Sequence, residues 1–135
     1  MSVVLDASIT MSWCFDDEAT NETERVLTLV SNIGAGVPPI WPFEIFNTLA
    51  IGERRRRITE FQSHRFLAML ARLPIQVHAM PWEDLSEELL GLSRQFQLSS
   101  YDASYLVLAI RTGSPLATQD RRLLEAAQRL GVPLA

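Results

Sequence analysis

The sequence contains no lysine, and all 12 of its basic residues are arginines. This absence excludes the phosphate-binding loop of P-loop nucleotide hydrolases, whose lysine reaches the phosphates. It also excludes Schiff-base catalysis, which needs a side-chain amine. A phosphate-directed function of this chain must therefore use other groups.

Cysteine and long apolar segments are also scarce. Cys14 is the single cysteine, so the chain forms no internal disulfide, which fits a reducing compartment. No apolar run approaches the roughly 18 residues that a membrane span needs, and the start "MSVVLDAS" lacks the pattern of a secretory signal. We therefore expect a cytoplasmic protein without a membrane partner, and its 135 residues predict one domain over 1–135.

The formal net charge of −4 argues against a whole-surface electrostatic grip on nucleic acid. The exception is local, in the run "ERRRR" at 53–57. Its arginines Arg54, Arg55, Arg56 and Arg57 are candidates for contacts with a phosphate backbone. They also fit a solvated helix end that complements the helix dipole.

Short β-rich runs alternate with helical patterns, which predicts an α/β fold with a parallel sheet. Pro42 opens the third predicted helix, and 58–73 is predicted to form a helical hairpin with it. On that hairpin, Phe61, Phe66, Leu67, Met69 and Leu70 are expected to be mostly core, with part of this surface serving an interface. The predicted strands are 2–7, 37–41, 74–80, 115–119 and 132–134, and the predicted helices include 9–15, 42–57, 58–73, 81–97 and 120–131. Two further helices have predicted caps: one within 16–34, with Thr20 or Asn21 as its N-cap and Gly34 at its end, and one over 99–113, with Ser99 or Ser100 as its N-cap and Gly113 at its end.

Four acids fall near the carboxyl ends of the predicted strands, where ligands bind in open parallel sheets. Asp6 ends the first strand and Asp120 the fourth, while Glu44 and Asp102 lie in the first turns of helices. Each acid has a structural explanation as well, because first-turn acids favour the helix dipole and Asp120 can cap a helix. Together they predict a cluster of carboxylates at one edge of the sheet.

Such a cluster needs protons or a cation, because two carboxylates 4 Å apart repel by about 4 kcal/mol at an effective dielectric of 20. An all-oxygen set of ligands favours Mg²⁺, with Mn²⁺ as a substitute, over zinc. A divalent ion of this kind activates water and offsets charge on the leaving oxygen in phosphodiester hydrolysis. Ser8, Asn47 and Thr118 are candidate supporting residues, each also compatible with a local capping or strand role.

Two other protein families also place acids at the ends of strands, but their motifs fit this sequence less well. Response-regulator receivers need a lysine after a late strand, and haloacid-dehalogenase phosphatases need a lysine and an Asp-x-Asp motif. This chain has no lysine, and its first motif is "DAS" at 6–8.

The pattern resembles the PIN-domain nucleases, in particular the VapC-type toxins of toxin–antitoxin pairs. The matching stretches follow the family's order and span the chain: "VVLDASI", "WPFEIFNTLAIG", "SSYDASYLVLAIRTGSPLATQDRRL" and "GVPL". The resemblance implies a three-layer α/β/α sandwich around a parallel sheet of four or five strands. It implies that Asp6, Glu44, Asp102 and Asp120 are the catalytic and metal-binding acids, accompanied by Ser8, Asn47 and Thr118.

The resemblance also implies an activity and partners. The expected function is a Mg²⁺-dependent endoribonuclease toxin that acts on RNA, forms a homodimer, and is neutralised by an antitoxin whose tail enters the acidic groove. Two alternatives stay open at this point. One is a PIN-type nuclease that acts in RNA maturation or on DNA without an antitoxin. The other is a non-catalytic module that binds an arginine-bearing partner and acts in transcriptional autoregulation.

Overall fold

A four-stranded parallel sheet forms the centre of the computed structural model, which describes residues 2–135. The strand order is β3-β2-β1-β4, with β1 at Val3–Leu5, β2 at Ala35–Val37, β3 at Ile75–Val77 and β4 at Leu116–Ala117. β1 lies between β2 and β4. After β1, the chain first forms β2 and β3 on one side of it and later adds β4 on the other side. The fold class and the parallel sheet predicted from the sequence are confirmed.

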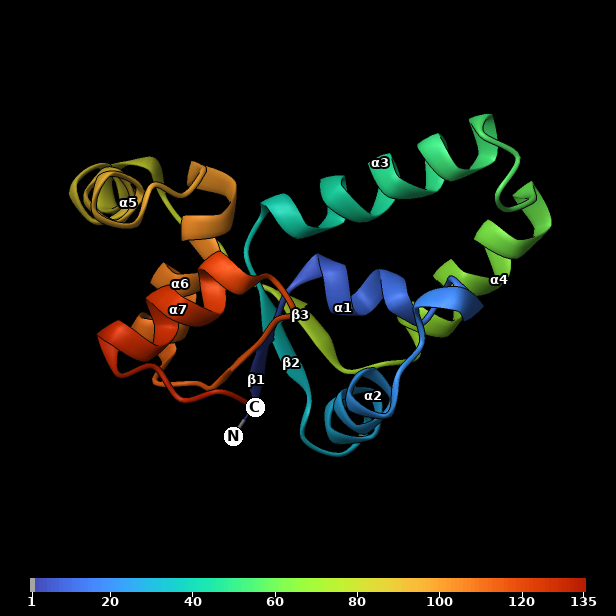
Figure 1. The fold of residues 1–135 in the computed structure, drawn as a ribbon, viewed down its shortest axis with the longest axis horizontal. Coiled ribbons are helices and arrows are strands. Elements are labelled where there is room, and N and C mark those ends of the chain that lie inside the picture. Colours follow the sequence, from blue (N-terminus) through green and yellow to red (C-terminus); the bar gives the residue numbers. More distant parts are fainter. Residues whose placement is uncertain (1) are drawn as a thin grey trace.

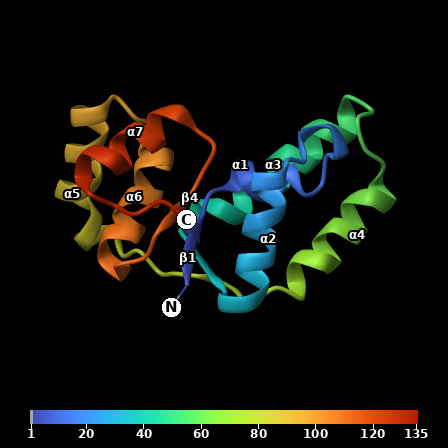
Figure 2. The same cartoon turned by 60° about the horizontal axis from the view of Figure 1, so that its bottom comes forward.

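Helices cover both faces of the sheet, giving three layers (Figures 1 and 2). On one side lie α5 (Trp82–Phe96), α6 (Ser100–Thr112) and α7 (Arg121–Leu130). On the other lie α1 (Ala7–Ser12), α2 (Asn21–Ile33), α3 (Ile40–Arg54) and α4 (Glu60–Ala71), with a short 3₁₀ turn, η1, at Asp16–Glu18. In Figure 1 the strands run upward from the N-terminus, so their carboxyl ends face α1 and the start of α3.

Helix ends follow the capping residues in the sequence. Thr20 caps α2 in a reciprocal arrangement with Thr23, and Thr59 caps α4 with Gln62 in the same way. Ser99 caps α6 by accepting a hydrogen bond from the backbone N–H of Asp102. Capping places the first turn of α6, and therefore its acid, at a defined point beside the sheet.

The core is the apolar layer between the sheet and its helices. β1 is buried on both faces, as its continuous apolar sequence predicts. α6 buries six residues and packs directly on the sheet. The largest side chains with almost no solvent exposure are Tyr105, Leu5, Ile9, Ile45 and Leu106. Residues directly after the strands are therefore anchored to rigid structure.

The strand predicted at 37–41 is wrong. β2 runs from Ala35 to Val37, and Pro38 and Pro39 follow it, with Pro39 as the N-cap residue of α3. The prolines therefore end the strand instead of beginning it, because they cannot donate to the ladder. α3 starts at Ile40, two residues earlier than predicted, and Pro42 lies in its first turn, where no backbone donor is needed.

The other strands are shorter than predicted. β4 has two residues, and the predicted strand at 132–134 is an isolated bridge between Leu134 and Leu116. On the α3–α4 pair, Phe66 and Leu70 are buried, as expected for the core part of this surface, whereas Phe61 is 68% exposed and lies outside the core. Phe61 lies in the first turn of α4, on the side that faces away from the core.

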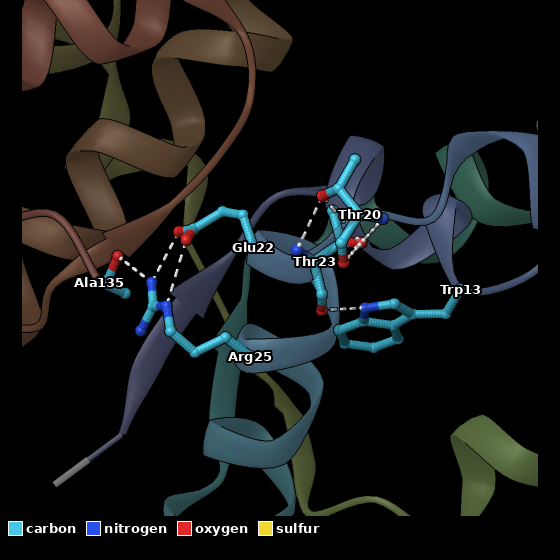
Figure 3. A network of polar contacts seen from close by, with 6 residues as sticks. All are labelled: Trp13, Thr20, Glu22, Thr23, Arg25 and Ala135. Atoms are coloured by element: carbon cyan, nitrogen blue, oxygen red, sulfur yellow. Dashed lines mark hydrogen bonds and ion pairs between the residues drawn. The ribbon is translucent and has the colours of Figure 1, made fainter.

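The start of α2 is tied to neighbouring segments by polar contacts (Figure 3). The indole of Trp13 donates to the backbone oxygen of Thr23 at 2.8 Å. Arg25 binds Glu22 and donates to the backbone oxygen of Ala135 at 2.8 Å. Across residues 2–135, the helices are too short or too polar to cross a lipid bilayer.

Candidate active site at the carboxyl edge of the sheet

Asp6 directly follows β1 and is held from the neighbouring strand. Its backbone N–H donates to the carbonyl of Ala117, which continues the β1–β4 ladder. The pairing places Thr118 beside it, and the Thr118 hydroxyl donates to Asp6 Oδ2 at 2.6 Å. Ser8 donates to the same oxygen at 3.0 Å. Asp6 is only 5% exposed, so these contacts compensate the burial of its carboxylate.

Asp120 lies on the other side of Thr118. Its backbone N–H donates to the Thr118 hydroxyl oxygen at 3.0 Å, so one threonine contacts both acids. Oδ1 of Asp120 accepts from the backbone N–H of Leu123 at 3.0 Å and caps α7. The capping role expected for Asp120 and its place beside Asp6 are thus both present in the structure.

Glu44 projects from α3 toward α6. The prediction that it lies in the first turn of its helix is wrong, because α3 begins at Ile40 and Glu44 falls in the second turn. Its Oε1 accepts a 2.5 Å hydrogen bond from the hydroxyl of Tyr105. The wall behind it is apolar, because Ile45 and Leu49 on the same helix are buried. Glu44 is half-buried, and its carboxylate is a charged group in a largely apolar wall.

Asp102 comes from the first turn of α6, one turn before Tyr105. Its backbone N–H is held by Ser99, while its side chain is half-buried. The first turn of a helix carries a partial positive charge, which favours a carboxylate there.

All four acids line one pocket of about 330 Å³. They come from four separate parts of the fold: the end of β1, the first half of α3, the start of α6, and the start of α7. Parallel strands direct these segments to one edge of the sheet. The complete lining is Asp6, Ala7, Ser8, Met11, Glu18, Glu44, Thr48, Asp102, Gln119 and Asp120.

Burial raises the pKa of three of these acids. For Asp6, the hydrogen bonds from Thr118 and Ser8 oppose the rise. Burial also raises the pKa of Glu44, with the charges of Asp6 and Asp102 adding to the rise and the Tyr105 hydroxyl opposing it. The pKa of Asp102 is raised by burial and then by the charges of Asp120 and Asp6. The carboxylates are therefore close enough to influence one another, and a positive charge in the pocket would stabilise all of them.

The sequence profile of the PIN domain matches residues 3–129. The chain belongs to the PIN-domain family. It is 25% identical over 135 residues to Ribonuclease VapC3 of Pyrobaculum aerophilum, a match that covers 98% of this chain and 100% of the relative. It also superposes on the crystal structure of PAE2754 from Pyrobaculum aerophilum with a TM-score of 0.65 and 26% identity, covering 93% of this chain and 87% of the other. The resemblance inferred from the sequence motifs is confirmed.

The carboxylates of this PIN domain suit a hard divalent cation by their chemistry, since every donor is oxygen. Their placement is more open than that of a finished metal site. Within residues 2–135, no three Asp, Glu, His or Cys side chains are grouped so that they could hold a metal ion. Asp6, Glu44 and Asp120 each give one carboxylate oxygen to a protein donor, which anchors the acids around the pocket. By their donor chemistry alone, the acids fit a hard divalent ion that takes its remaining ligands from water or phosphate oxygens.

Two of the three supporting polar residues predicted from the sequence contact the acids of the PIN-domain pocket. Ser8 and Thr118 both donate to Asp6. Asn47 is exposed and does not line the pocket; Thr48, one residue later, does. A helix turns by about 100° per residue, so positions i+3 and i+4 both lie near Glu44 and sequence spacing alone does not choose between them.

The arginine run divides into two parts. Arg54, Arg55 and Arg56 are exposed at the end of α3 and after it. Arg57 binds Asp17 at 2.9 Å and Glu18 at 2.7 Å, and its guanidinium lies 3.9 Å from the centre of the Phe15 ring. Arg57 is therefore already engaged by η1 and the residue before it.

The sequence interpretation did not identify Tyr105, which contacts Glu44, and it assigned Glu18, which lines the pocket, to a solvated helix entry. Tyr105 looks like a core aromatic on an apolar helix, and only its hydroxyl contact with Glu44 connects it to the pocket. Glu18 belongs to the acidic stretch 16–18, which reads as a solvated helix entry. The sequence feature that could have identified Tyr105 is its position one helical turn after Asp102, which places both residues on the same face of the helix.

Proposed function

We propose that this chain is a Mg²⁺-dependent endoribonuclease that acts as the toxin of a toxin–antitoxin pair, with residues 1–135 forming a single nuclease domain in the cytoplasm. The observation that carries the proposal is the convergence of four carboxylates on one pocket at the carboxyl edge of the sheet. Membership of the PIN-domain family and the likeness to a relative named Ribonuclease VapC3 support it.

Asp6, Glu44, Asp102 and Asp120 are the residues that would hold Mg²⁺ or Mn²⁺. When bound, the ion lowers the pKa of water and offsets charge on the phosphodiester. The chain's own contribution is rigidity: Thr118 and Ser8 orient Asp6, and the α7 cap orients Asp120. Carboxylates fixed in this way lose little freedom when they bind a cation.

RNA is the proposed substrate, and Arg54, Arg55 and Arg56 are proposed contacts with its backbone. Their exposure at the end of α3 supports this role, while Arg57 is bound to Asp17 and Glu18. Arginine contacts with phosphates position a nucleic acid without reading its sequence.

The proposed protein partners are an antitoxin and a second copy of the chain. Exposed aromatic side chains support an interface, because Trp82 is 84% exposed and Phe43, which is 70% exposed, lines an apolar pocket of about 300 Å³. The acidic pocket itself suits an arginine side chain from an antitoxin.

A non-catalytic binding module is the second candidate. The observation that favours it is the absence, within the described residues 2–135, of three side chains already grouped to hold a metal ion. In this reading the carboxylates receive an arginine from a partner protein and the complex acts in transcriptional autoregulation.

One titration separates the two candidates. The purified chain is mixed with single-stranded and structured RNA in Mg²⁺, in Mn²⁺ and in EDTA, and RNA ends are sequenced. The nuclease predicts cleavage that needs the ion and is lost in Asp102→Asn, while the exposed-acid variant Glu24→Gln keeps activity. A chain that is neither stabilised by the ion nor able to cut RNA is the binding module.

A further inference from the structure

Tyr105 is a fully buried tyrosine whose hydroxyl meets an acid of the pocket. It lies on α6, is 0% exposed, and packs within the apolar core. Its hydroxyl donates to Glu44 Oε1 at 2.5 Å. A buried hydroxyl needs a partner, and here the partner is a pocket carboxylate instead of a backbone carbonyl.

The contact restricts a flexible side chain. Glu44 has three rotatable side-chain bonds, whereas the ring of Tyr105 is fixed by packing on all sides. A charge-assisted hydrogen bond from a fixed donor therefore selects one orientation of the Glu44 carboxylate. The hydrogen bond from Tyr105 involves only the Oε1 atom of Glu44, a residue that lines the pocket.

The same contact joins two elements of the site. Asp102 and Tyr105 are one turn apart on α6, and Glu44 comes from α3. The hydrogen bond thus ties the position of Glu44 to the helix that carries Asp102. Thr118 does the same for the other pair, since it contacts both Asp6 and Asp120.

We propose that Tyr105 is a positioning residue that holds Glu44 in register with Asp102 for binding a divalent cation. This role rests on the proposed metal-dependent function. It concerns how the site is built and does not give Tyr105 contact with the substrate.

The chain offers a matched pair of variants, because it has two tyrosines and both are on α6. Tyr105→Phe removes the hydroxyl with little change in volume. Tyr101→Phe removes the hydroxyl of a 60% exposed tyrosine and is the control. We expect Tyr105→Phe to weaken Mn²⁺ binding, measured by titration calorimetry, by about tenfold or more, as for other residues that orient metal ligands. Equal Mn²⁺ affinity in Tyr105→Phe and Tyr101→Phe would overturn the proposal.

A double-mutant cycle tests whether Tyr105 acts through Glu44. In a Glu44→Gln background, Tyr105→Phe should weaken Mn²⁺ binding by less than twofold, because the oriented carboxylate is already gone. A full additional loss in that background would mean that Tyr105 acts through core packing, which contradicts the positioning role.

A measurement on the unmutated chain covers the case in which Tyr105→Phe does not fold. Incorporated 3-fluorotyrosine gives two fluorine NMR signals, assigned with Tyr101→Phe. Mg²⁺ should shift the Tyr105 signal, and Glu44→Gln should abolish this response. A Tyr105 signal that ignores Mg²⁺ while the chain binds it overturns the positioning role alone, whereas a wild-type chain that binds neither Mg²⁺ nor Mn²⁺ and cuts no RNA overturns the proposed function as well.

Discussion

The hydroxyl of Thr118 donates a 2.6 Å hydrogen bond to the carboxylate of Asp6, although the two residues are 112 positions apart in the chain. The β1–β4 pairing brings them together, because Leu5 lies opposite Ala117 and the residue that directly follows each strand forms this contact. The same hydroxyl accepts from the backbone N–H of Asp120. The buried Thr118 therefore contacts two of the four acids of the pocket, Asp6 and Asp120.

Thr118→Val should destabilise the protein by about 1–3 kcal/mol, because it leaves a buried carboxylate and a backbone donor without their shared partner. Urea unfolding measures the change in the free energy of unfolding. Ser8→Ala is the matched control: it removes the other donor to the same Asp6 oxygen, from an exposed position, and should cost less. An equal or larger loss in Ser8→Ala would contradict this assignment.

Asp6→Asn and Asp102→Asn should each lower RNA cleavage by about 100-fold or more while leaving the fold intact. The amide of asparagine keeps an oxygen that can accept from Thr118, so the packing around Asp6 is preserved. Relief of repulsion in the pocket should raise the melting temperature, by about 4 °C for each kcal/mol relieved. Cleavage assays and thermal unfolding check both effects, with Glu24→Gln as the control. Retained cleavage in both variants would refute the site.

Stability in metal-free buffer should depend on pH in a specific direction. Asp6, Glu44 and Asp102 have raised pKa values in the folded chain, chiefly through burial. Above these raised values the folded protein holds carboxylates charged that would be better solvated when unfolded, so the cost is present at neutral pH. As pH falls through the raised values toward the unfolded value of 3.8 for aspartate, the acids take up protons and the cost disappears.

The free energy of unfolding should therefore increase as the pH falls from neutral toward 3.8, and this increase should be smaller in Asp6→Asn. Chemical unfolding of both proteins in EDTA across this range measures it. Metal affinity should follow the opposite trend, since protons compete with the cation for the same oxygens. Identical pH dependence in the wild type and Asp6→Asn would show that Asp6 makes no such contribution.

Mg²⁺ should stabilise the folded chain, because the ion binds the assembled pocket and not the unfolded chain. At a free concentration of about 100 times Kd the expected gain is about 2.7 kcal/mol, reversed by EDTA. Thermal unfolding with increasing Mg²⁺ measures the gain. The shift should be absent in Asp6→Asn, and a shift that persists there would place the ion elsewhere.

Arg54→Ser and Arg55→Ser, each made alone, should weaken RNA binding and reduce its dependence on salt concentration, because one fewer phosphate charge is neutralised. Binding at several salt concentrations gives the slope. Arg57→Ser is the matched variant in the same run: its guanidinium pairs with Asp17 and Glu18, so it should change the slope less. Equal slopes for all variants and the wild type would exclude the run as an RNA contact.

The sequence was sufficient for the fold class because the determining signals are local. Apolar strand patterns such as that around β1, cap residues such as Thr20 and Ser99, and Gly113 after α6 act over a few residues. The order of strands and helices then limits the parallel topologies that the chain can adopt. Strand 37–41 was misplaced because a Pro-Pro pair suits either end of a short strand, and sequence pattern alone does not distinguish them.

Three of the four acids, Asp6, Asp102 and Asp120, could be named from the sequence because each follows or opens an element at the carboxyl edge of the sheet. Glu44 could be named because it lies near the start of a helix that follows a strand. Only the tertiary structure decided which neighbours hold them: Thr118 for Asp6, Tyr105 for Glu44, and Thr48 instead of Asn47 beside the pocket. The physical reason is the distance along the chain between the residues that interact. Secondary structure depends on residues within a turn or two, whereas the direction of a side chain in a pocket depends on packing between helices and strands that are far apart in the chain.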